Sequence, residues 1–243
     1  MPKAFFIDTT KCTACRGCQI ACKEWKELAP NATLQQGSHQ NPPDLNYNNY
    51  KIVRFSEFKE ADGTVRWNFF PDQCRHCVDA PCVLTAQGHV DGAFVKDAAT
   101  GAVYCTNLTK KLSKDAFEDI RSACPFDIPR RDAATGLVNK CNMCLERVQK
   151  DMLPMCVKTC CTGAMNFGER ADMAAMAKAR LAVVAQEFPE ATLNDVDFVS
   201  TIYLMAFKPE RYWKNAVAQA PAPMSRKQFL ARLTAPVRNT ARG

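Results

Sequence analysis

Two segments rich in β-branched and aromatic residues predict a β-hairpin in the first third of the chain. They are Tyr50–Phe58 and Thr64–Phe70, and Asp62-Gly63 between them is a sequence typical of a tight turn. The segments between the cysteine groups have the pattern of short strands and turns.

Two other segments repeat apolar residues at helical spacing. A short helix is predicted by Ile20, Ala21, Trp25 and Leu28. A longer amphipathic helix is predicted by Met173, Met176, Ala177, Val184 and Phe188. The second segment contains no metal-binding residue, and we assign it to core packing with no cofactor role.

No segment of the sequence predicts a membrane-spanning helix. The longest apolar stretch, Val196–Phe207, is interrupted by Asp197, Ser200 and Thr201 and is far shorter than the roughly 20 residues that a bilayer requires. Met1–Thr10 lacks the charged and apolar regions of a secretory signal. We therefore expect a soluble chain with no transmembrane segment and no export signal of its own.

Charge is concentrated in the last 30 residues. The formal net charge of +7 arises mainly from six basic residues after residue 213, which are Lys214, Arg226, Lys227, Arg232, Arg238 and Arg242. The remainder is nearly neutral, which argues against a nucleic-acid-binding surface. We expect the Ala/Pro-rich tail from Lys214 to be a linker with a short helix near Ser225–Leu233.

Cysteine is the unusual feature of the composition, with 14 in 243 residues. The first group has the spacing Cys-x2-Cys-x2-Cys-x3-Cys, which is typical of bacterial cluster ferredoxins. In such motifs three close thiolates bind one [4Fe–4S] cluster and the fourth reaches a neighbouring cluster. A second motif of spacing Cys-x2-Cys-x11-Cys-x3-Cys begins at Cys141 and supplies the reciprocal ligands.

The spacing predicts three [4Fe–4S] clusters. Cluster A uses Cys12, Cys15, Cys18 and Cys160. Cluster B uses Cys22, Cys141, Cys144 and Cys156. Cluster C uses Cys74, Cys77, Cys82 and Cys124, the last of which begins a Cys-Pro step. We expect the two remaining cysteines, Cys105 and Cys161, to be buried apolar thiols.

A fourth cluster is not expected, because Ala86, Leu108 and Lys111 stand where further cysteine ligands would be needed. His76 and His89 could in principle replace cysteine, but we expect them to stay outside the ligand sets. Zinc is the main chemical alternative, although it has no need of a third cysteine at x2 and a fourth at x3. A disulfide framework fits less well, because neighbours at x2 are poorly placed to bridge.

Six cationic or potentially cationic residues stand next to cysteines of the predicted ligand sets. They are Lys11, Arg16, Lys23, Arg75, His76 and Lys140. A cluster with its thiolates is a net anion and reduction adds negative charge, so nearby cations raise its reduction potential. We expect some of the six to tune potentials and the others to be solvated surface charges.

An internal repeat links the middle of the chain to its second half. Asp97–Gly101 and Asp132–Gly136 have the same five residues, and each is expected to lead through a short strand to a cysteine, Cys105 or Cys141. The repeat indicates two related lobes.

Several motifs closely resemble those of the iron–sulfur subunit of formate dehydrogenases. They are Lys11–Leu28, Gly37–Leu45, Cys74-Arg-His-Cys77, Ala80-Pro-Cys82 and Cys124–Arg130. Cluster spacings of this kind are shared by the iron–sulfur subunits of other molybdopterin oxidoreductases, including those for dimethyl sulfoxide, polysulfide and nitrate. Only Gly37–Leu45 and its neighbours therefore point to formate.

The resemblance implies an α+β fold with two ferredoxin-like lobes related by pseudo-symmetry, a β-hairpin insertion, and a C-terminal helix and tail. Residues 1–34 and 137–168 would form the lobe with clusters A and B, and 67–136 the lobe with cluster C. Residues 35–66 would be the insertion and 169–243 the C-terminal helix and basic tail.

The resemblance also implies a non-catalytic electron-transfer subunit. Its partner would be a large catalytic subunit with a molybdenum or tungsten bis-pterin centre, and electrons would leave to a cytochrome or another acceptor. We expect the periplasm, through co-export with that subunit, with the cytoplasm as the alternative. The alternative functions are the iron–sulfur subunit of another molybdopterin oxidoreductase and a free-standing polyferredoxin or zinc-binding structural protein.

Overall fold

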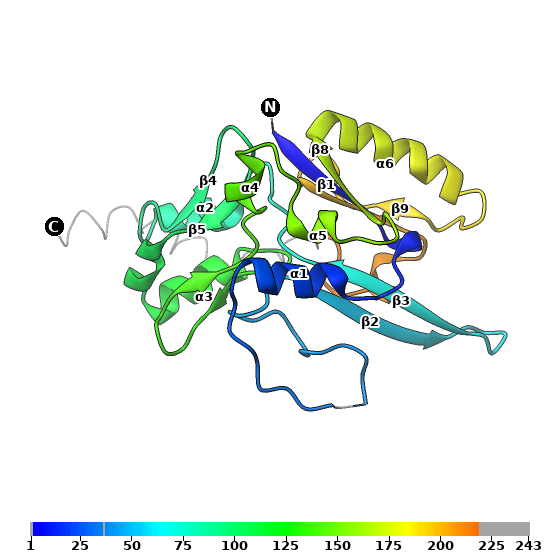
Figure 1. Cartoon of the computed structure of the whole chain (residues 1–243), viewed down its shortest axis with the longest axis horizontal. Coiled ribbons are helices and arrows are strands. Elements are labelled where there is room, and N and C mark those ends of the chain that lie inside the picture. Colours follow the sequence, from blue (N-terminus) through cyan, green and yellow to red (C-terminus); the bar gives the residue numbers. More distant parts are fainter. Residues whose placement is uncertain (1, 36, 219–243) are drawn as a thin grey trace, which may run out of the picture.

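The computed structural model describes residues 2–35 and 37–218, which form a mixed α+β fold (Figure 1). The strands are β1 (Lys3–Asp8), β2 (Ile52–Lys59), β3 (Val65–Asp72), β4 (Phe94–Lys96), β5 (Val103–Cys105), β6 (Arg130–Arg131), β7 (Val138–Asn139), β8 (Met165–Glu169), β9 (Thr192–Leu193) and β10 (Thr201–Met205). The helices are α1 (Gly17–Trp25), α2 (Pro81–Gln87), α3 (Lys114–Ser122), α4 (Leu145–Val148), α5 (Met155–Lys158) and α6 (Arg170–Val184). Single 3-10 turns are η1 (Thr9–Lys11), η2 (Asn107–Lys111) and η3 (Pro209–Arg211).

A four-stranded sheet in the order β8-β1-β10-β9 joins the two ends of the described chain. Strand β1 runs parallel to β10 and antiparallel to β8. Helix α6 covers one face of this sheet, where Ala4 and Phe6 pack against it, while Phe5 and Ile7 face the opposite side (Figure 1). Because both faces are covered, β1 and β10 are almost continuously apolar.

The sequence analysis did not identify strand β10. It lies within the apolar stretch Val196–Phe207, to which we assigned no element, and its partner β1 lies almost 200 residues earlier in the chain. The expectation that a linker begins at Lys214 is wrong for residues 214–218, because Ala216 is fully buried in the core beside Tyr212. The rest of the tail, with the predicted helix at Ser225–Leu233, lies outside the described residues.

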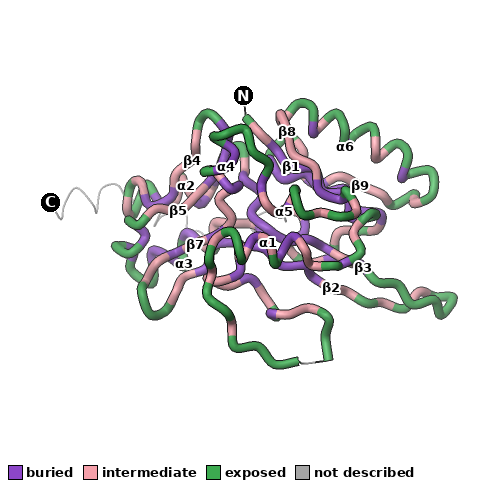
Figure 2. Tube along the Cα trace, in the orientation of Figure 1, coloured by how far each residue is buried: buried purple, intermediate pink, exposed green. Residues whose placement is uncertain are grey.

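The predicted β-hairpin is confirmed. Strands β2 and β3 pair antiparallel from Ile52 opposite Asp72 to Lys59 opposite Val65, and Gly63 in the turn has a φ of +88°. The base of the hairpin is buried and its tip projects outward (Figure 2). Phe70 stacks on Tyr203 of β10 with ring centroids 4.4 Å apart, which fixes the hairpin against the sheet.

Both predicted helices form, but their buried faces differ from the apolar pattern. Helix α1 buries Cys18 and Cys22 and leaves Ile20 59% exposed, because its inward face belongs to the cysteines. Helix α6 buries Met173, Ala177 and Val184. Met176 of the predicted stripe lies on the flank of α6 and is 44% exposed, and the helix ends before Phe188.

The repeated five-residue motif forms the same turn twice. In the first copy the Thr100 hydroxyl and backbone N–H both donate to Asp97 Oδ2, and in the second Thr135 donates in the same way to Asp132. Each turn joins a short hairpin, β4–β5 or β6–β7, so the expected strands before Cys105 and Cys141 are present. The pseudo-symmetry of whole lobes stays a prediction.

No helix in residues 2–35 or 37–218 combines the length and the apolar character needed to cross a lipid bilayer. The longest of the described helices, α6, has 15 residues.

Candidate metal centres

Three of the four Cys-x2-Cys steps, those that begin at Cys12, Cys74 and Cys141, share one local geometry. The residue two positions after the first cysteine has a positive φ in each of them: 54° at Ala14, 45° at His76 and 64° at Met143. This turn brings the backbone N–H of His76 to 3.4 Å from Cys74 Sγ and that of Met143 to 3.4 Å from Cys141 Sγ. Non-glycine residues in this region carry strain, which is concentrated at functional sites.

The twelve cysteines assigned to clusters line three separate cavities, one set to each. Cavity A is lined by Cys12, Cys15, Cys18 and Cys160. Cavity B is lined by Cys22, Cys141, Cys144 and Cys156. Cavity C is lined by Cys74, Cys77, Cys82 and Cys124.

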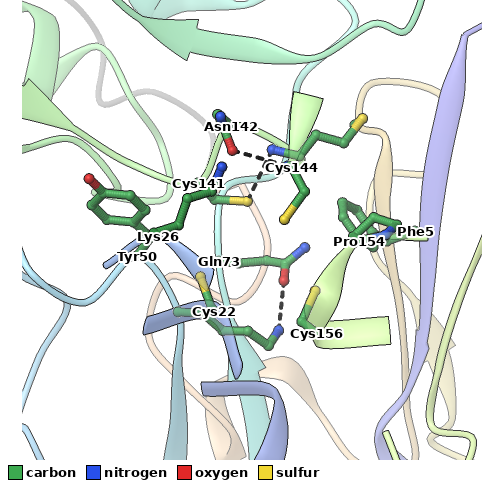
Figure 3. A pocket seen from close by; sticks show the side chains of 12 residues that line it. Phe5, Cys22, Lys26, Tyr50, Gln73, Cys141, Asn142, Cys144, Pro154 and Cys156 are labelled. Carbon is green, nitrogen blue, oxygen red and sulfur yellow. Dashed lines mark hydrogen bonds between the residues drawn. The ribbon is translucent and has the colours of Figure 1, made fainter. Parts of the chain in front are cut away.

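Each cavity gathers its cysteines from distant parts of the chain. In cavity B, helix α1 provides Cys22, the loop before α4 provides Cys141 and Cys144, and α5 provides Cys156. Figure 3 shows these four side chains around one common space, with Gln73 pointing into it from the end of the hairpin. The reciprocal arrangement inferred from spacing therefore corresponds to real proximity.

The cavities match one another in size and differ from a single-ion site. Their empty volumes, including the part open to solvent, are about 320 Å³ for A, 320 Å³ for B and 330 Å³ for C. Within the part of the chain that the structure describes, no three metal-ligating side chains converge closely enough to hold one ion. The four cysteines of each set therefore line a shared space without converging on one point, which agrees with a multi-iron cluster.

Burial disfavours the thiolate form of several of these cysteines. It raises the pKa of Cys12 to about 11 and the pKa values of Cys77 and Cys141 to about 12. Iron–sulfur clusters bind thiolates, so assembly must displace these protons, and the free energy of cluster binding must cover that cost.

Two buried lysines indicate that the cavities favour anionic groups. Lys51 and Lys140 are both buried, and their ammonium groups donate only to neutral oxygens, those of Gln73 and Pro71 for Lys51 and of Val103 and Cys141 for Lys140. Among the described residues no carboxylate lies within salt-bridge distance of either lysine. An unpaired buried cation is costly, and an anionic cluster in the neighbouring cavity would compensate it.

Comparison with known proteins places the chain in a family. The model of a 4Fe-4S dicluster domain matches residues 65–170. The chain is 57% identical to formate dehydrogenase 2 subunit beta (cytochrome c-553) of Nitratidesulfovibrio vulgaris, over 89% of this chain and 99% of that protein. It is 49% identical to formate dehydrogenase subunit beta of Megalodesulfovibrio gigas, over 90% of this chain and 100% of that protein. The formate dehydrogenase-O iron-sulfur subunit of Escherichia coli is 33% identical, over 86% of this chain and 69% of that protein.

This chain belongs to the iron–sulfur electron-transfer (beta) subunits of formate dehydrogenases. It therefore carries 4Fe–4S clusters, and the resemblance found in the cysteine motifs and in Gly37–Leu45 is confirmed.

The six residues predicted to tune potentials in this formate dehydrogenase subunit occupy different environments. Arg16 lines cavity A, and Arg75 and Lys140 line cavity C. Lys11 is exposed, and the Lys23 ammonium donates to the carbonyls of Ala29 and Asn48 instead of facing a cavity. The structure thus separates residues that face a cavity from residues that are only adjacent to a cysteine in sequence.

Arg75 is a buried cation that already has an anionic partner. Its Nη1 lies 2.7 Å from Asp72 Oδ1, and Asp72 Oδ2 lies 2.7 Å from Arg54 Nε. The Arg75 guanidinium also lies 4.8 Å from the ring centre of Tyr203. Because Asp72 offsets part of its charge, Arg75 is expected to affect cavity C less than an unpaired lysine would.

His76 connects the loop of cavity C to a cysteine of cavity B. Its Nδ1 accepts a hydrogen bond from the backbone N–H of Val103 at 3.0 Å, so the proton resides on Nε2, which lies 3.5 Å from Cys141 Sγ. Burial lowers the pKa of His76 well below 6.5, and the charges of Lys140 and Lys96 lower it further. A neutral imidazole therefore donates toward the Cys141 sulfur.

The two leftover cysteines behave differently from each other. Cys105 is half-buried beside the apolar core of Phe94 and Val103, and burial raises its pKa to about 12. Cys161, which we expected to be buried, is exposed, and its Sγ lies 3.8 Å from Cys15 Sγ. The reason is the turn after Cys160, which directs Cys160 into cavity A and leaves the next side chain in solvent.

Sequence reasoning missed two residues of the site, Lys51 and Gln73. Both lie at the base of the hairpin and line cavity B. Burial by itself would lower the pKa of Lys51, but the sulfurs of Cys18 and Cys156, when they carry negative charge, raise it above the usual value. The available signal was a lysine inside the apolar and aromatic segment that predicts strand β2.

Proposed function

We propose that this chain relays electrons through three [4Fe–4S] clusters. The electrons come from a catalytic subunit that oxidises formate, and they leave to an external acceptor. The observation that carries the proposal is the agreement between cysteine spacing and cavity lining. Each of three cavities of nearly equal size is lined by one complete set of four cysteines.

The ligand sets follow from this agreement. Cys12, Cys15, Cys18 and Cys160 would hold cluster A; Cys22, Cys141, Cys144 and Cys156 cluster B; and Cys74, Cys77, Cys82 and Cys124 cluster C. Each cluster, when bound, supplies a one-electron redox site. The protein buries most of these cysteines at least in part, supplies N–H groups toward the sulfurs of Cys74 and Cys141, and has the buried Lys51 and Lys140 lining the cavities.

The arrangement of the cavities supports the order A–B–C along the relay. Cavities A and B share helix α1, which contributes Cys18 to one and Cys22 to the other. Cavities B and C meet where His76, between Cys74 and Cys77, reaches Cys141 of cavity B. Cavity B therefore lies between the other two.

The partners are inferred from the family. We assign formate oxidation to a large catalytic subunit with a molybdenum or tungsten bis-pterin centre, and this chain has no substrate chemistry of its own. The name of the N. vulgaris relative includes cytochrome c-553, which supports a c-type cytochrome as the acceptor. The resemblance to subunits that are exported with their catalytic partner favours the periplasm, which cell fractionation tests.

The decisive experiment measures iron and acid-labile sulfide on the anaerobically purified complex, with formate-dependent dye reduction on the same sample. We expect the iron and sulfide of three [4Fe–4S] clusters in this chain, after subtraction of any cluster in the catalytic subunit. We also expect formate to reduce those clusters in the complex and to leave the separated chain oxidised.

Other outcomes have specific meanings. Iron without sulfide, or zinc in its place, would contradict the cluster assignment. A complex that reduces dyes with another molybdopterin substrate and does not respond to formate would contradict formate as the electron source while leaving the relay intact.

A further inference from the structure

Lys51 is the one fully buried lysine at the base of the described hairpin, and it lies between two cavities. It precedes strand β2, and its ammonium donates to Gln73 Oε1 at 2.6 Å and to the carbonyl of Pro71 at 3.3 Å. Figure 3 shows Gln73 inside cavity B, with a dashed line marking the hydrogen bond that it accepts.

The two acceptors of Lys51 belong to different cavities. Gln73 lines cavity B, whereas Pro71 lines cavity A together with Val53 of strand β2. The ammonium group is therefore held at the wall that separates A from B. The cysteine sulfurs whose negative charge would act most strongly on it lie on both sides, Cys18 of cavity A and Cys156 of cavity B.

The charge of Lys51 has no carboxylate to offset it among residues 2–35 and 37–218, since none of the salt bridges there includes this residue. Arg75 is also buried, but Asp72 pairs with it. Lys140 is also unpaired, but it lines cavity C and donates to Val103 and to the backbone of Cys141. Lys51 is therefore the buried cation common to A and B.

We propose that Lys51 raises the reduction potentials of clusters A and B together. A positive charge in a low-dielectric wall stabilises the added electron on either neighbouring cluster, and the stabilisation is of similar size because the charge lies between them. The reduction potentials of clusters A and B then stay close to each other, which keeps electron exchange between the two clusters reversible. This inference rests on the proposed function, because it requires clusters in both cavities.

The test compares redox titrations of the anaerobic complex, followed by electron paramagnetic resonance, for four variants. Lys51→Gln removes the charge but keeps a hydrogen-bond donor. Lys51→Arg keeps the charge. Gln73→Glu leaves Lys51 in place and neutralises it with a carboxylate of the same size. Lys23→Gln is the matched control, because its ammonium bonds loop carbonyls and lines no cavity.

Lys51→Gln and Gln73→Glu are expected to move two of this chain's three transitions to lower potential. The expected change is about tenfold in each one-electron equilibrium constant, which corresponds to ~59 mV. Lys51→Arg keeps the charge, so its potentials should stay close to those of the wild type. Lys23→Gln should leave all three transitions unchanged.

The inference is overturned if no transition moves, if only one does, or if all three move equally in Lys51→Gln and Gln73→Glu. If Lys51→Gln does not assemble, Gln73→Glu decides the question, because it retains the lysine. Failure of the proposed function is a separate result, since the wild-type complex would then lack the iron and sulfide of these clusters.

Discussion

Cys15 and Cys161 show how closely a ligand and a non-ligand can lie in this chain. Both are exposed, and their sulfur atoms are 3.8 Å apart. Only Cys15 lines cavity A, because the turn that orients Cys160 inward carries Cys161 past the cavity. The position of the side chain, and not its chemistry, distinguishes the two roles.

Cys161→Ser is expected to keep all three clusters, whereas Cys15→Ser is expected to lose cluster A, about one third of the iron of this chain. Iron and acid-labile sulfide per chain, measured on anaerobic complex, check both variants. Cys105→Ser is the matched control, since Cys105 is the other cysteine outside the ligand sets. Loss of cluster A in Cys161→Ser with its retention in Cys15→Ser would show that Cys161 is the ligand.

Among the elements, the loop of residues 37–45 is tied to two strands by one carboxylate. Asp44 accepts from Arg54 Nη2 at 2.6 Å and from Arg130 Nη2 at 2.8 Å, so it joins the loop to strand β2 and to strand β6. Gln40 adds a second link, because its Oε1 accepts from the Phe55 N–H at 3.0 Å. Leu45 at the end of the loop is also buried in an apolar core, so both polar and apolar contacts anchor this loop.

Asp44→Asn is expected to destabilise the protein by about 1 kcal/mol, a value reduced for the partial exposure of the carboxylate. Burial by itself would raise the pKa of Asp44, but Arg54 and Arg130 lower it below the usual 3.8. A lowered carboxyl pKa stabilises the fold above the unfolded pKa, and this stability is lost as pH falls through the folded pKa.

The difference in unfolding free energy between wild type and Asp44→Asn should therefore be constant from about pH 6 to about pH 8. Anaerobic denaturant titrations across that range measure it. Asp91→Asn, at an exposed position outside this network, is the control. A difference that grows or disappears within this range would contradict the ion-pair explanation.

On the scale of the whole molecule, cysteines are distributed unevenly among the apolar cores. The core between α6 and the sheet contains no cysteine and consists of Ala4, Phe6, Met173, Ala177, Val184, Ile202 and Leu204. The other three described cores each include at least one cysteine of the ligand sets. Cluster binding is therefore expected to stabilise those three cores directly and the α6 core only through the sheet.

Removal of the clusters should unfold the molecule in a graded way. After anoxic chelation of iron we expect amide hydrogen exchange to accelerate by more than tenfold in α1, α2 and α5, while β1, β10 and α6 keep most of their protection. Mass spectrometry of the exchanged peptides measures this, with chelator-free protein as the control. Equal loss of protection in all segments would show that the fold is a single cooperative unit.

How much could be predicted depended on how local each feature is. The cysteine sets could be predicted from spacing because two or three members of each set lie within a few residues of one another, as Cys12, Cys15 and Cys18 do. The hairpin and both helices were predicted for the same reason. The buried face of α1 does not follow its apolar pattern, because Cys18 and Cys22 occupy the inward side and Ile20 is exposed.

The amino-acid sequence alone predicted which cysteines belong together, because cluster ligation favours fixed intervals along the chain. Only the tertiary structure decided that Lys51 lies between two cavities, that His76 reaches a cysteine of the neighbouring cavity, and that Cys161 is in solvent. These properties depend on burial, and burial is produced by segments far apart in sequence, such as β1 and β10. No local pattern of residues encodes such a pairing.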